Sequence, residues 1–556
     1  MKFKIFIQLS FLIVVIFLSS CGVKKALADR PNLDGYNQQV VMRQKINDST
    51  FTVGKNFLTR NKQGLWELYI EGDAWQRGKA IGELEQDLIK KQEAVFFGKL
   101  EKLVPSKTWQ NFLVKFLAYY NRRMPDYITE EYKTEILGVS EYMSSDFNNI
   151  AQPYVRALYL HSAHDIGHAL QDLALVGCSS FAVWNEKSED GGLLIGRNFD
   201  FYVNDEFAED KVIAFINPKE GYKFMSYTWP GFSGVVSGMN DQGLTVTINA
   251  GKSKIPTVAK TPISIVAREI LQYASNIEEA IAIAKKREVF VSESIFVGSA
   301  KDKKASIIEV SPYNFGVYEV PNSADQLLCA NHFQSEAYKD DKRNIKQIEE
   351  SHSEYRFERM QELLAEENKL NPKKAVAILR NKNGLGDKEI GYGNEKALNQ
   401  LLAHHGIVFQ PEKLKVWVSA NPFQLGEFVC YDLNEVFSEK RIASEKFKLS
   451  EANENIDEDP FVHSEAFKNY QEYRKLEMEV ANKISEKEEI EPETFSRLIK
   501  LNPEFWKAHY LQGVYYYKKG YDAAAKVAFE KAKTKEITTV PDAESIDRYL
   551  RKLWRD

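Results

Sequence analysis

Apolar positions before residue 177 recur mainly at helical spacing. From Gly72 to about Leu103 the apolar residues fall three or four positions apart, and the same spacing returns at 128–143 and 153–173. Such spacing places apolar side chains on one face of a helix. The block 22–177 is therefore predicted to be mostly helical, with a strand-like stretch at Trp66–Ile70.

After Gly177 short β-rich runs alternate with helical ones. The predicted strands are 180–184, 193–201, 212–216, 223–229, 234–239, 244–249, 294–299, 305–310, 315–320, 326–333, 414–419 and 426–432. The predicted helices are 263–274, 277–287, 352–366 and 373–381. Strands and helices in this order indicate an α+β fold with two sheets and helices outside them.

The last part of the chain has a different texture. Residues 436–462 are polar and charged and are predicted to be a linker, and 463–556 are predicted to be all helical. One tetratricopeptide-repeat (TPR) spacing is matched by Gly513, Gly520, Ala525, Phe529 and Ala532. A free-standing stack needs roughly three repeats. We therefore expect a separate TPR-like helical hairpin without catalytic residues, which covers its neighbour or docks a protein partner.

The first residues have the order of a secretory signal. Lys2 and Lys4 precede an apolar run, Ile5–Leu18, that is shorter than the roughly 20 residues of a membrane-spanning helix. Small residues and then Cys21 follow, as in a bacterial lipobox. We expect residues 1–20 to be a lipoprotein signal peptide and Cys21 to be lipidated. The chain would then be held at a membrane in the cell envelope, and the sequence after Cys21 favours the periplasmic face while leaving the outer surface open. A cleaved signal without lipid and an uncleaved anchor are the alternatives.

Length, charge and cysteine content limit the number of domains, the kinds of partner and the possible disulfides. The length of 556 residues predicts two or three domains, and the net charge of −5 with no strongly basic stretch argues against nucleic acid as a partner. If Cys21 carries lipid, Cys178, Cys329 and Cys430 remain, and three cysteines cannot all pair within the chain. Cys329 and Cys430 lie in apolar runs and are expected in the core.

Cys178 has a different setting. Gly177 and Cys178 open the first strong strand, and Arg197 and Asp200 form an Arg-x-x-Asp motif on the next one. This pairing resembles the cysteine-type N-terminal nucleophile (Ntn) hydrolases, which include choloylglycine hydrolases, acid ceramidase and the penicillin-forming acyltransferases. The resemblance is closest to the acyltransferases, because a long helical segment precedes the cysteine. It implies an αββα four-layer sandwich, with residues 21–177 as a lipid-anchored prosegment and 178–435 as the catalytic core.

Three later positions extend the resemblance, which covers about 60–435. Asn249 ends a strand where the family has an oxyanion-hole asparagine, Asn331 matches a second family asparagine, and Arg356 matches a late arginine. His332, His404 and His405 lack the spacing of a metal site, so we expect them to be structural and expect neither metal nor cofactor.

The chemistry of these residue types supports the resemblance. A thiol is a good nucleophile only as thiolate, and an α-amine with a pKa of about 8 can take its proton. The amine of Cys178 becomes available only if the Gly177–Cys178 bond is cut. Asp200 would hold the resulting ammonium, Arg197 would balance Asp200, and the Asn249 amide would stabilise the oxyanion.

The expected function is a self-activated hydrolase or acyltransferase acting on linear amide bonds of a small N-acyl substrate through a thioester. An ester or lipid-amide hydrolase of the same fold is one alternative, and an inactive lipid-anchored binding protein is another. Taken singly, Cys178 could be a buried small side chain, Arg197 and Asp200 an ordinary ion pair, and Asn249 a strand end.

Overall fold

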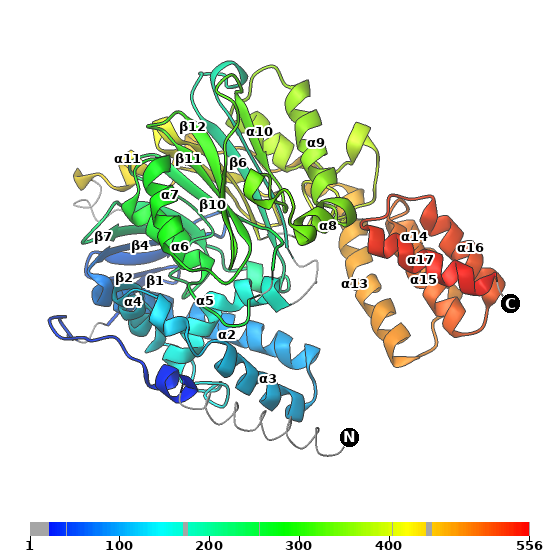
Figure 1. The fold of residues 1–556 in the computed structure, drawn as a ribbon, viewed down its shortest axis with the longest axis horizontal. Helices are drawn as coiled ribbons and strands as arrows, with labels where there is room; N and C mark the ends of the chain where they lie inside the picture. The colour runs from blue at the N-terminus through cyan, green and yellow to red at the C-terminus, as the bar shows by residue number, and fades with distance from the viewer. Residues whose placement is uncertain are drawn as a thin grey trace.

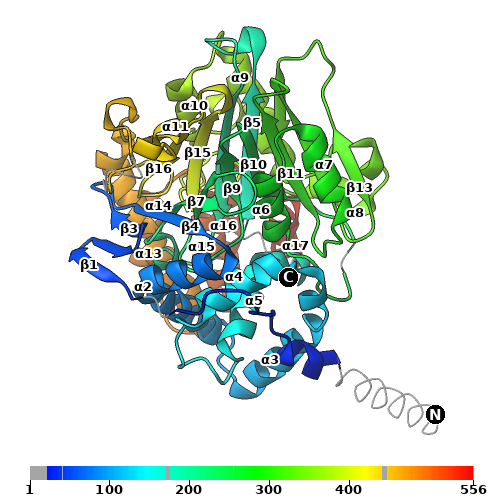
Figure 2. The ribbon, with the colours of Figure 1, turned by 90° about the vertical axis from the view of Figure 1, so that its left-hand side faces the viewer.

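A computed structural model of the chain describes residues 22–39, 42–170, 176–254, 256–402, 404–440 and 447–554. The predicted signal peptide and Cys21 lie outside the described residues. The strands form two sheets, and helices lie on the outer faces of these sheets (Figures 1 and 2). Within the described residues no helix combines the length and apolarity needed to cross a bilayer.

The larger sheet has eleven strands in the order β1-β2-β3-β4-β7-β8-β9-β10-β11-β12-β13. Neighbouring strands are antiparallel except β4 and β7, which run parallel. The strands are β1 (Gln44–Asn47), β2 (Thr50–Val53), β3 (Asn56–Arg60), β4 (Trp66–Gly72), β7 (Val212–Pro218), β8 (Phe224–Thr228), β9 (Ser237–Asn240), β10 (Leu244–Ala250), β11 (Glu293–Ser299), β12 (Lys304–Val310) and β13 (Phe315–Tyr318).

The smaller sheet has six strands in the order β14-β5-β6-β15-β16-β17. They are β14 (Gln326–Cys329), β5 (Val176–Val183), β6 (Leu194–Phe201), β15 (His405–Gln410), β16 (Lys415–Ser419) and β17 (Phe428–Asp432). β15 was not predicted from the sequence, yet it lies at the centre of the sheet between β6 and β16.

Apolar side chains from both sheets fill the space between them, which makes the α+β arrangement a sandwich of four layers. The inner core includes Ile195, Phe215, Phe296, Ile407 and Val418. Helices α2 (Ala74–Leu103), α6 (Ile263–Tyr273) and α7 (Ile277–Lys286) cover the larger sheet. Helices α9 (Ser353–Glu366) and α10 (Pro372–Leu379) cover the smaller one, and α8 (Lys342–Glu350) precedes them.

The segment before Cys178 is less helical than the sequence predicted. Its helices α3 (Lys107–Tyr120), α4 (Glu130–Ser140) and α5 (Pro153–Leu170) join α2, but β1–β4 extend the larger sheet. The strands β1–β3 escaped prediction because they are only four or five residues long and β1 is exposed throughout, so no alternation marks them. Through β4 and β7 this segment is continuous with the sheet of the predicted core.

A buried ion-pair cluster also ties this segment to α6. Glu135 on α4 accepts hydrogen bonds from Arg77 Nε at 2.7 Å and from Arg268 Nη2 on α6 at 3.2 Å. Although burial opposes ionisation, the guanidinium groups of Arg268 and Arg77 lower the pKa of Glu135 to about 2. Both sides of the Gly177–Cys178 bond therefore share one charged core.

After β17 and α11 (Leu433–Val436), the C-terminal part is helical, as predicted. It comprises α13 (Glu465–Glu486), α14 (Pro492–Leu501), α15 (Trp506–Lys518), α16 (Asp522–Lys533) and α17 (Val540–Leu553), on the right in Figure 1. Gly513 on α15 faces the ring of Phe529 on α16, the close approach that the predicted repeat requires. Whether this is a TPR relative stays a prediction. These helices form their own apolar core, to which Leu401 and Leu425 of the preceding domain contribute.

Candidate active site

The register between β5 and β6 arranges the predicted motif. Gly177 pairs with Asp200 and Cys178 pairs with Phe199. Because side chains alternate along a strand, Cys178, Phe199 and Arg197 share the face toward the larger sheet, whereas Gly177 and Asp200 share the opposite face.

The Cys178 thiol is fully buried beside Arg197, whose Nη2 lies 3.8 Å from Sγ. Burial raises the pKa of this thiol, and the Arg197 guanidinium opposes the rise. Arg197 also donates to Ser237 Oγ and to the backbone carbonyl of Ile248, and it stacks on Phe199. The arginine is thus fixed by several partners with one edge on the sulfur.

The backbone nitrogen of Cys178 lies at the centre of a buried hydrogen-bond network. It donates to Asn331 Oδ1 at 2.8 Å, and the same oxygen accepts from Arg356 Nη2 at 2.6 Å. Arg356 Nη1 donates to the Cys178 carbonyl and, at 2.8 Å, to Ser179 Oγ. Asn331 follows β14, and its own N–H donates to Ser353 Oγ on α9 at 2.7 Å. Elements far apart in sequence therefore converge on the peptide unit at 178.

Asp200 lies on the other face of β6. Its Oδ1 accepts from Gln424 Nε2 at 3.0 Å, and its Oδ2 has no hydrogen-bond partner among the described residues. Burial raises the pKa of Asp200 to about 7 against the lowering effects of Arg356, Gln424 and Arg197. No ion pair joins Asp200 to Arg197 within the described part of the chain, because the two side chains point to opposite faces.

Asn249 is present at the predicted strand end, but its polar atoms are engaged. Its Oδ1 accepts from Ser180 Oγ at 3.0 Å, and its Nδ2 donates to the carbonyls of Cys329 and Ala330 at 3.2 and 3.3 Å. An oxyanion role would require one of these two long bonds to be replaced.

Two glutamines at the site were not predicted from the sequence. Gln424 binds Asp200, and the side chain of Gln400 lies over Gly177, where an added Cβ would fall 2.2 Å from Gln400 Nε2. Both sit in loops without periodicity. Neither a motif nor a spacing in the sequence marks them.

The three histidines have mainly structural surroundings. His405 Nε2 lies 2.9 Å from Ser237 Oγ, His404 and His405 face each other through their Nδ1 atoms, and His332 Nδ1 contacts Ser353 Oγ. Burial lowers the pKa of all three, to about 4 for His332. Over the described ranges no cluster of three metal-ligating side chains was found.

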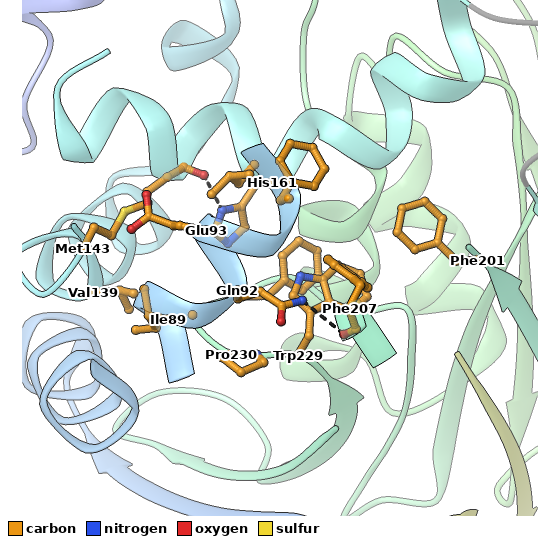
Figure 3. Close-up of a pocket in the computed structure, with 15 residues that line it drawn as sticks. Ile89, Gln92, Glu93, Val139, Met143, His161, Phe201, Phe207, Trp229 and Pro230 are labelled. Carbon is orange, nitrogen blue, oxygen red and sulfur yellow. Dashed lines mark hydrogen bonds between the residues drawn. The ribbon is translucent and has the colours of Figure 1, made fainter. Parts of the chain in front are cut away.

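An apolar cavity of about 50 Å³ opens near this site (Figure 3). The segment before Cys178 contributes Ile89, Met143 and His161, and the part after it contributes Phe201, Phe207, Trp229 and Phe232. Phe199, the cross-strand partner of Cys178, stacks on Phe201 at 5.7 Å, and Cys178 belongs to the same apolar cluster as Trp229. An aromatic path therefore leads from the thiol's neighbour to the cavity.

The central part of the chain is similar to a known protein family. Residues 184–423 match the family model "Acyl-coenzyme A:6-aminopenicillanic acid acyl-transferase". The matched range contains Arg197, Asp200, Asn249, Asn331 and Arg356, and it begins after Cys178.

Two curated proteins are distantly similar. An uncharacterized protein of Archaeoglobus fulgidus is 24% identical over 295 residues, which cover 48% of this chain and 47% of that protein. Protein dcd1B of Dictyostelium discoideum is 24% identical over 263 residues, which cover 44% of this chain and 50% of that protein. The chain spans about half the length of the curated relatives it matches.

Two solved structures are also similar at low identity. An N-acylethanolamine-hydrolyzing acid amidase ortholog from Caenorhabditis elegans is 17% identical, with a TM-score of 0.31, over 42% of this chain and 93% of that one. A conjugated bile acid hydrolase mutant from Clostridium perfringens is 13% identical, with a TM-score of 0.31, over 46% of this chain and 93% of that one. Residues 184–423 are thus similar to the acyl-coenzyme A:6-aminopenicillanic acid acyl-transferase family, the kind of acyltransferase to which the sequence resemblance was closest.

Proposed function

We propose that this chain cuts itself between Gly177 and Cys178 and then cleaves the amide bond of a small N-acyl substrate. The observation that carries the proposal is the hydrogen bonding around the Cys178 nitrogen. Asn331 Oδ1 accepts from that nitrogen at 2.8 Å while binding the buried Arg356 guanidinium. The atom that would become the catalytic base is therefore held by Asn331, which Arg356 in turn holds in place.

Self-cleavage is required because an amide nitrogen within a chain is not basic. The Cys178 thiol attacks the Gly177 carbonyl carbon, its proton passes to the departing nitrogen, and a thioester forms as the amide bond breaks. Water then hydrolyses the thioester, which leaves a Gly177 carboxylate and a Cys178 with free thiol and free amine. The tight fit of Gly177 under Gln400 supports this step, because it holds the scissile peptide in one place.

After the cut, the α-amine of Cys178 takes the thiol proton and the thiolate attacks the substrate carbonyl. Arg197, 3.8 Å from Sγ, favours the thiolate. The unpartnered Oδ2 of Asp200 lies on the face vacated by Gly177 and is suited to bind the new ammonium. The leaving amine then takes the proton, and the acyl group stays on Cys178 as a thioester until water or a second amine accepts it.

The apolar cavity supports an acyl group as the part of the substrate that is recognised. Its walls are mostly aromatic and aliphatic, and they come from both sides of the cut. A hydrocarbon or aromatic acyl chain gains about 25 cal/mol per Å² of apolar surface buried there. The same lining favours a lipid amide or ester as the second candidate substrate class.

We further propose that the protein is anchored at a membrane through lipidated Cys21 and lies on it with helix α3. Trp109 and Phe112 on α3 are 61% and 55% exposed, and Lys107 and Lys115 flank them. An exposed aromatic stripe with lysines is typical of helices at a lipid surface. Gly22, the first described residue, lies beside Arg122 just past α3, so the described chain starts close to that helix.

A panel of paired N-acyl amides and esters, with short and long acyl groups, tests the reaction. Wild-type protein should release amine from the amides and carry the acyl group on Cys178 in a mass spectrum of trapped enzyme, and Cys178→Ala should do neither. Turnover that persists in Cys178→Ala would exclude the proposed chemistry. An inactive binding protein would show no turnover on any substrate.

A further inference from the structure

Helix α13 in the C-terminal part packs against three loops of the core domain. These are the loops 202–205, 399–402 and 421–426. Each loop adjoins a residue of the cleavage site: the first follows Asp200, the second holds Gln400 and the third holds Gln424. The helix itself lies outside the range that matches the family model.

The loop 399–402 places Gln400 over Gly177. The next residue, Leu401, has a left-handed backbone with φ of 53° although it carries a side chain. Such a conformation persists only where the surroundings impose it. Tyr470 on α13 donates its hydroxyl to the Leu401 carbonyl at 3.1 Å, and the Leu401 side chain is fully buried in the apolar core of the C-terminal helices.

The loop 421–426 repeats this arrangement on the other side of the site. Phe423 is left-handed with φ of 52° and directly precedes Gln424. Phe467 on α13 meets the ring of Phe423 edge-on at 6.3 Å, and the Arg474 guanidinium lies over that ring at 5.4 Å. Both strained residues are thus neighbours of a site glutamine and are held by the same helix.

The third loop follows β6. Arg474 binds the Asp205 carboxylate through two hydrogen bonds of 2.8 and 2.7 Å and also donates to Tyr202 Oη at 3.1 Å. The end of β6, which carries Asp200, is therefore tied to α13 as well. An arginine paired with a carboxylate at two points fixes orientation as well as distance.

We propose that α13 is a positioning element for the cleavage site. Tyr470 holds the loop that sets Gln400 on Gly177, and Phe467 with Arg474 holds the loop that sets Gln424 on Asp200. The C-terminal helices then take part in activation without touching the reacting atoms. This inference rests on the self-cleavage proposed above.

The first test compares two tyrosines of α13 in the full chain. Tyr470→Phe removes only the hydroxyl that binds Leu401, whereas Tyr473→Phe removes a buried hydroxyl without a partner among the described residues. Cleavage is followed by mass after a pulse of cell-free synthesis. Tyr470→Phe should slow the appearance of the two chains by about tenfold, as expected for a misplaced scissile group. Tyr473→Phe should cut at the wild-type rate.

The second test separates positioning from loss of stability. Phe467→Leu and Phe495→Leu each shorten a buried aromatic side chain of the same apolar core and should lower Tm similarly, but only Phe467 contacts Phe423. Loss of the Gln424 hydrogen bond removes one influence that lowers the pKa of Asp200, while Arg356 and Arg197 remain. In Phe467→Leu the acid limb of the pH–activity profile should move to higher pH, and in Phe495→Leu it should stay.

The outcomes distinguish the two proposals. If wild type is cut and Tyr470→Phe is cut equally fast, or if Phe495→Leu shifts the profile as Phe467→Leu does, α13 is not a positioning element. If active wild type stays in one piece, the self-cleavage proposal is wrong and this inference falls with it. A slow Tyr470→Phe, with a profile that moves only for Phe467→Leu, supports the inference.

Discussion

Gly177 and Asp200 are direct cross-strand partners on β5 and β6, so the carboxyl group lies on the face from which residue 177 would depart. In the uncut chain Asp200 Oδ2 has no partner among the described residues, and burial raises the pKa of the group to about 7. A carboxyl group kept partly neutral in the uncut chain is ready for an ammonium that only cleavage supplies.

Asp200→Asn should separate stability from activity. A carboxyl group whose pKa is raised in the folded state stabilises the fold below its unfolded pKa of about 3.8, and that contribution is lost as pH rises through about 7. In the Cys178→Ala background, where the chain stays uncut, the double variant should therefore unfold at a higher temperature at pH 8 than Cys178→Ala alone. The two should be equal near pH 4. With Cys178 intact, Asp200→Asn should lose most activity. A lower Tm at pH 8 would contradict this account.

Asn331→Leu should block cleavage far more than it unfolds the protein. The change removes the acceptor shared by the Cys178 nitrogen and Arg356, and leaving a buried donor unpaired costs about 1–3 kcal/mol. Asn198→Leu is the matched control, because Asn198 is a buried amide on β6 whose side chain, among the described residues, binds just the carbonyls of Leu379 and Leu398. Denaturant unfolding should show similar losses for both, while only Asn331→Leu prevents the two chains from appearing.

The two chains should stay associated after the cut and separate in acid. The Glu135 cluster joins Arg77 on one chain to Arg268 on the other, and it holds the pKa of Glu135 at about 2. A carboxyl group whose pKa is lowered in the folded state stabilises the fold at pH values above its unfolded pKa of about 4.5. For Glu135 this contribution is lost as the pH falls toward about 2.

Size-exclusion chromatography of cut protein should give one peak at pH 7 and separated chains near pH 2.5. Glu135→Gln should separate at higher pH than wild type. Glu130→Gln on the same helix is the control, since Glu130 is exposed and its ion pair within the described ranges is with Lys133 of its own chain. Equal behaviour of the two variants would show that the cluster does not hold the chains together.

The exposed face of α3 should contribute to membrane binding. Replacing Trp109 and Phe112 by Ser in a chain that begins at residue 22 removes apolar surface without disturbing the buried core. Binding to vesicles of anionic lipid, measured by co-sedimentation, should fall several-fold. Trp554→Ser is the control, because Trp554 is 70% exposed at the far C-terminal helix. An equal fall for both would point to non-specific adsorption.

Much of the fold was predictable because the long strands and helices carry clear periodicity. The strand around Arg197 and Asp200 and the helices α6 and α7 were predicted within a few residues. β15 was missed because it begins at His405, directly after His404, and its residues show no alternation. Its place in the sheet is set by pairing with β6 and β16, which the sequence does not display.

Some residues of the candidate site were predictable from the sequence and others were not. Cys178, Arg356 and Asn331 were predicted from motifs, and the structure brings them into contact. Gln400 and Gln424 were not predictable, because their positions follow from strained loops held by a helix that lies far along the chain. Local sequence carries propensity, whereas such contacts depend on tertiary packing.

The most direct test of the account is N-terminal sequencing of purified, active protein, combined with its mass. The account predicts two chains, one of which begins at Cys178, and it predicts a single uncut and inactive chain for Cys178→Ala. Full activity in a chain that is continuous through Gly177 and Cys178 would contradict it.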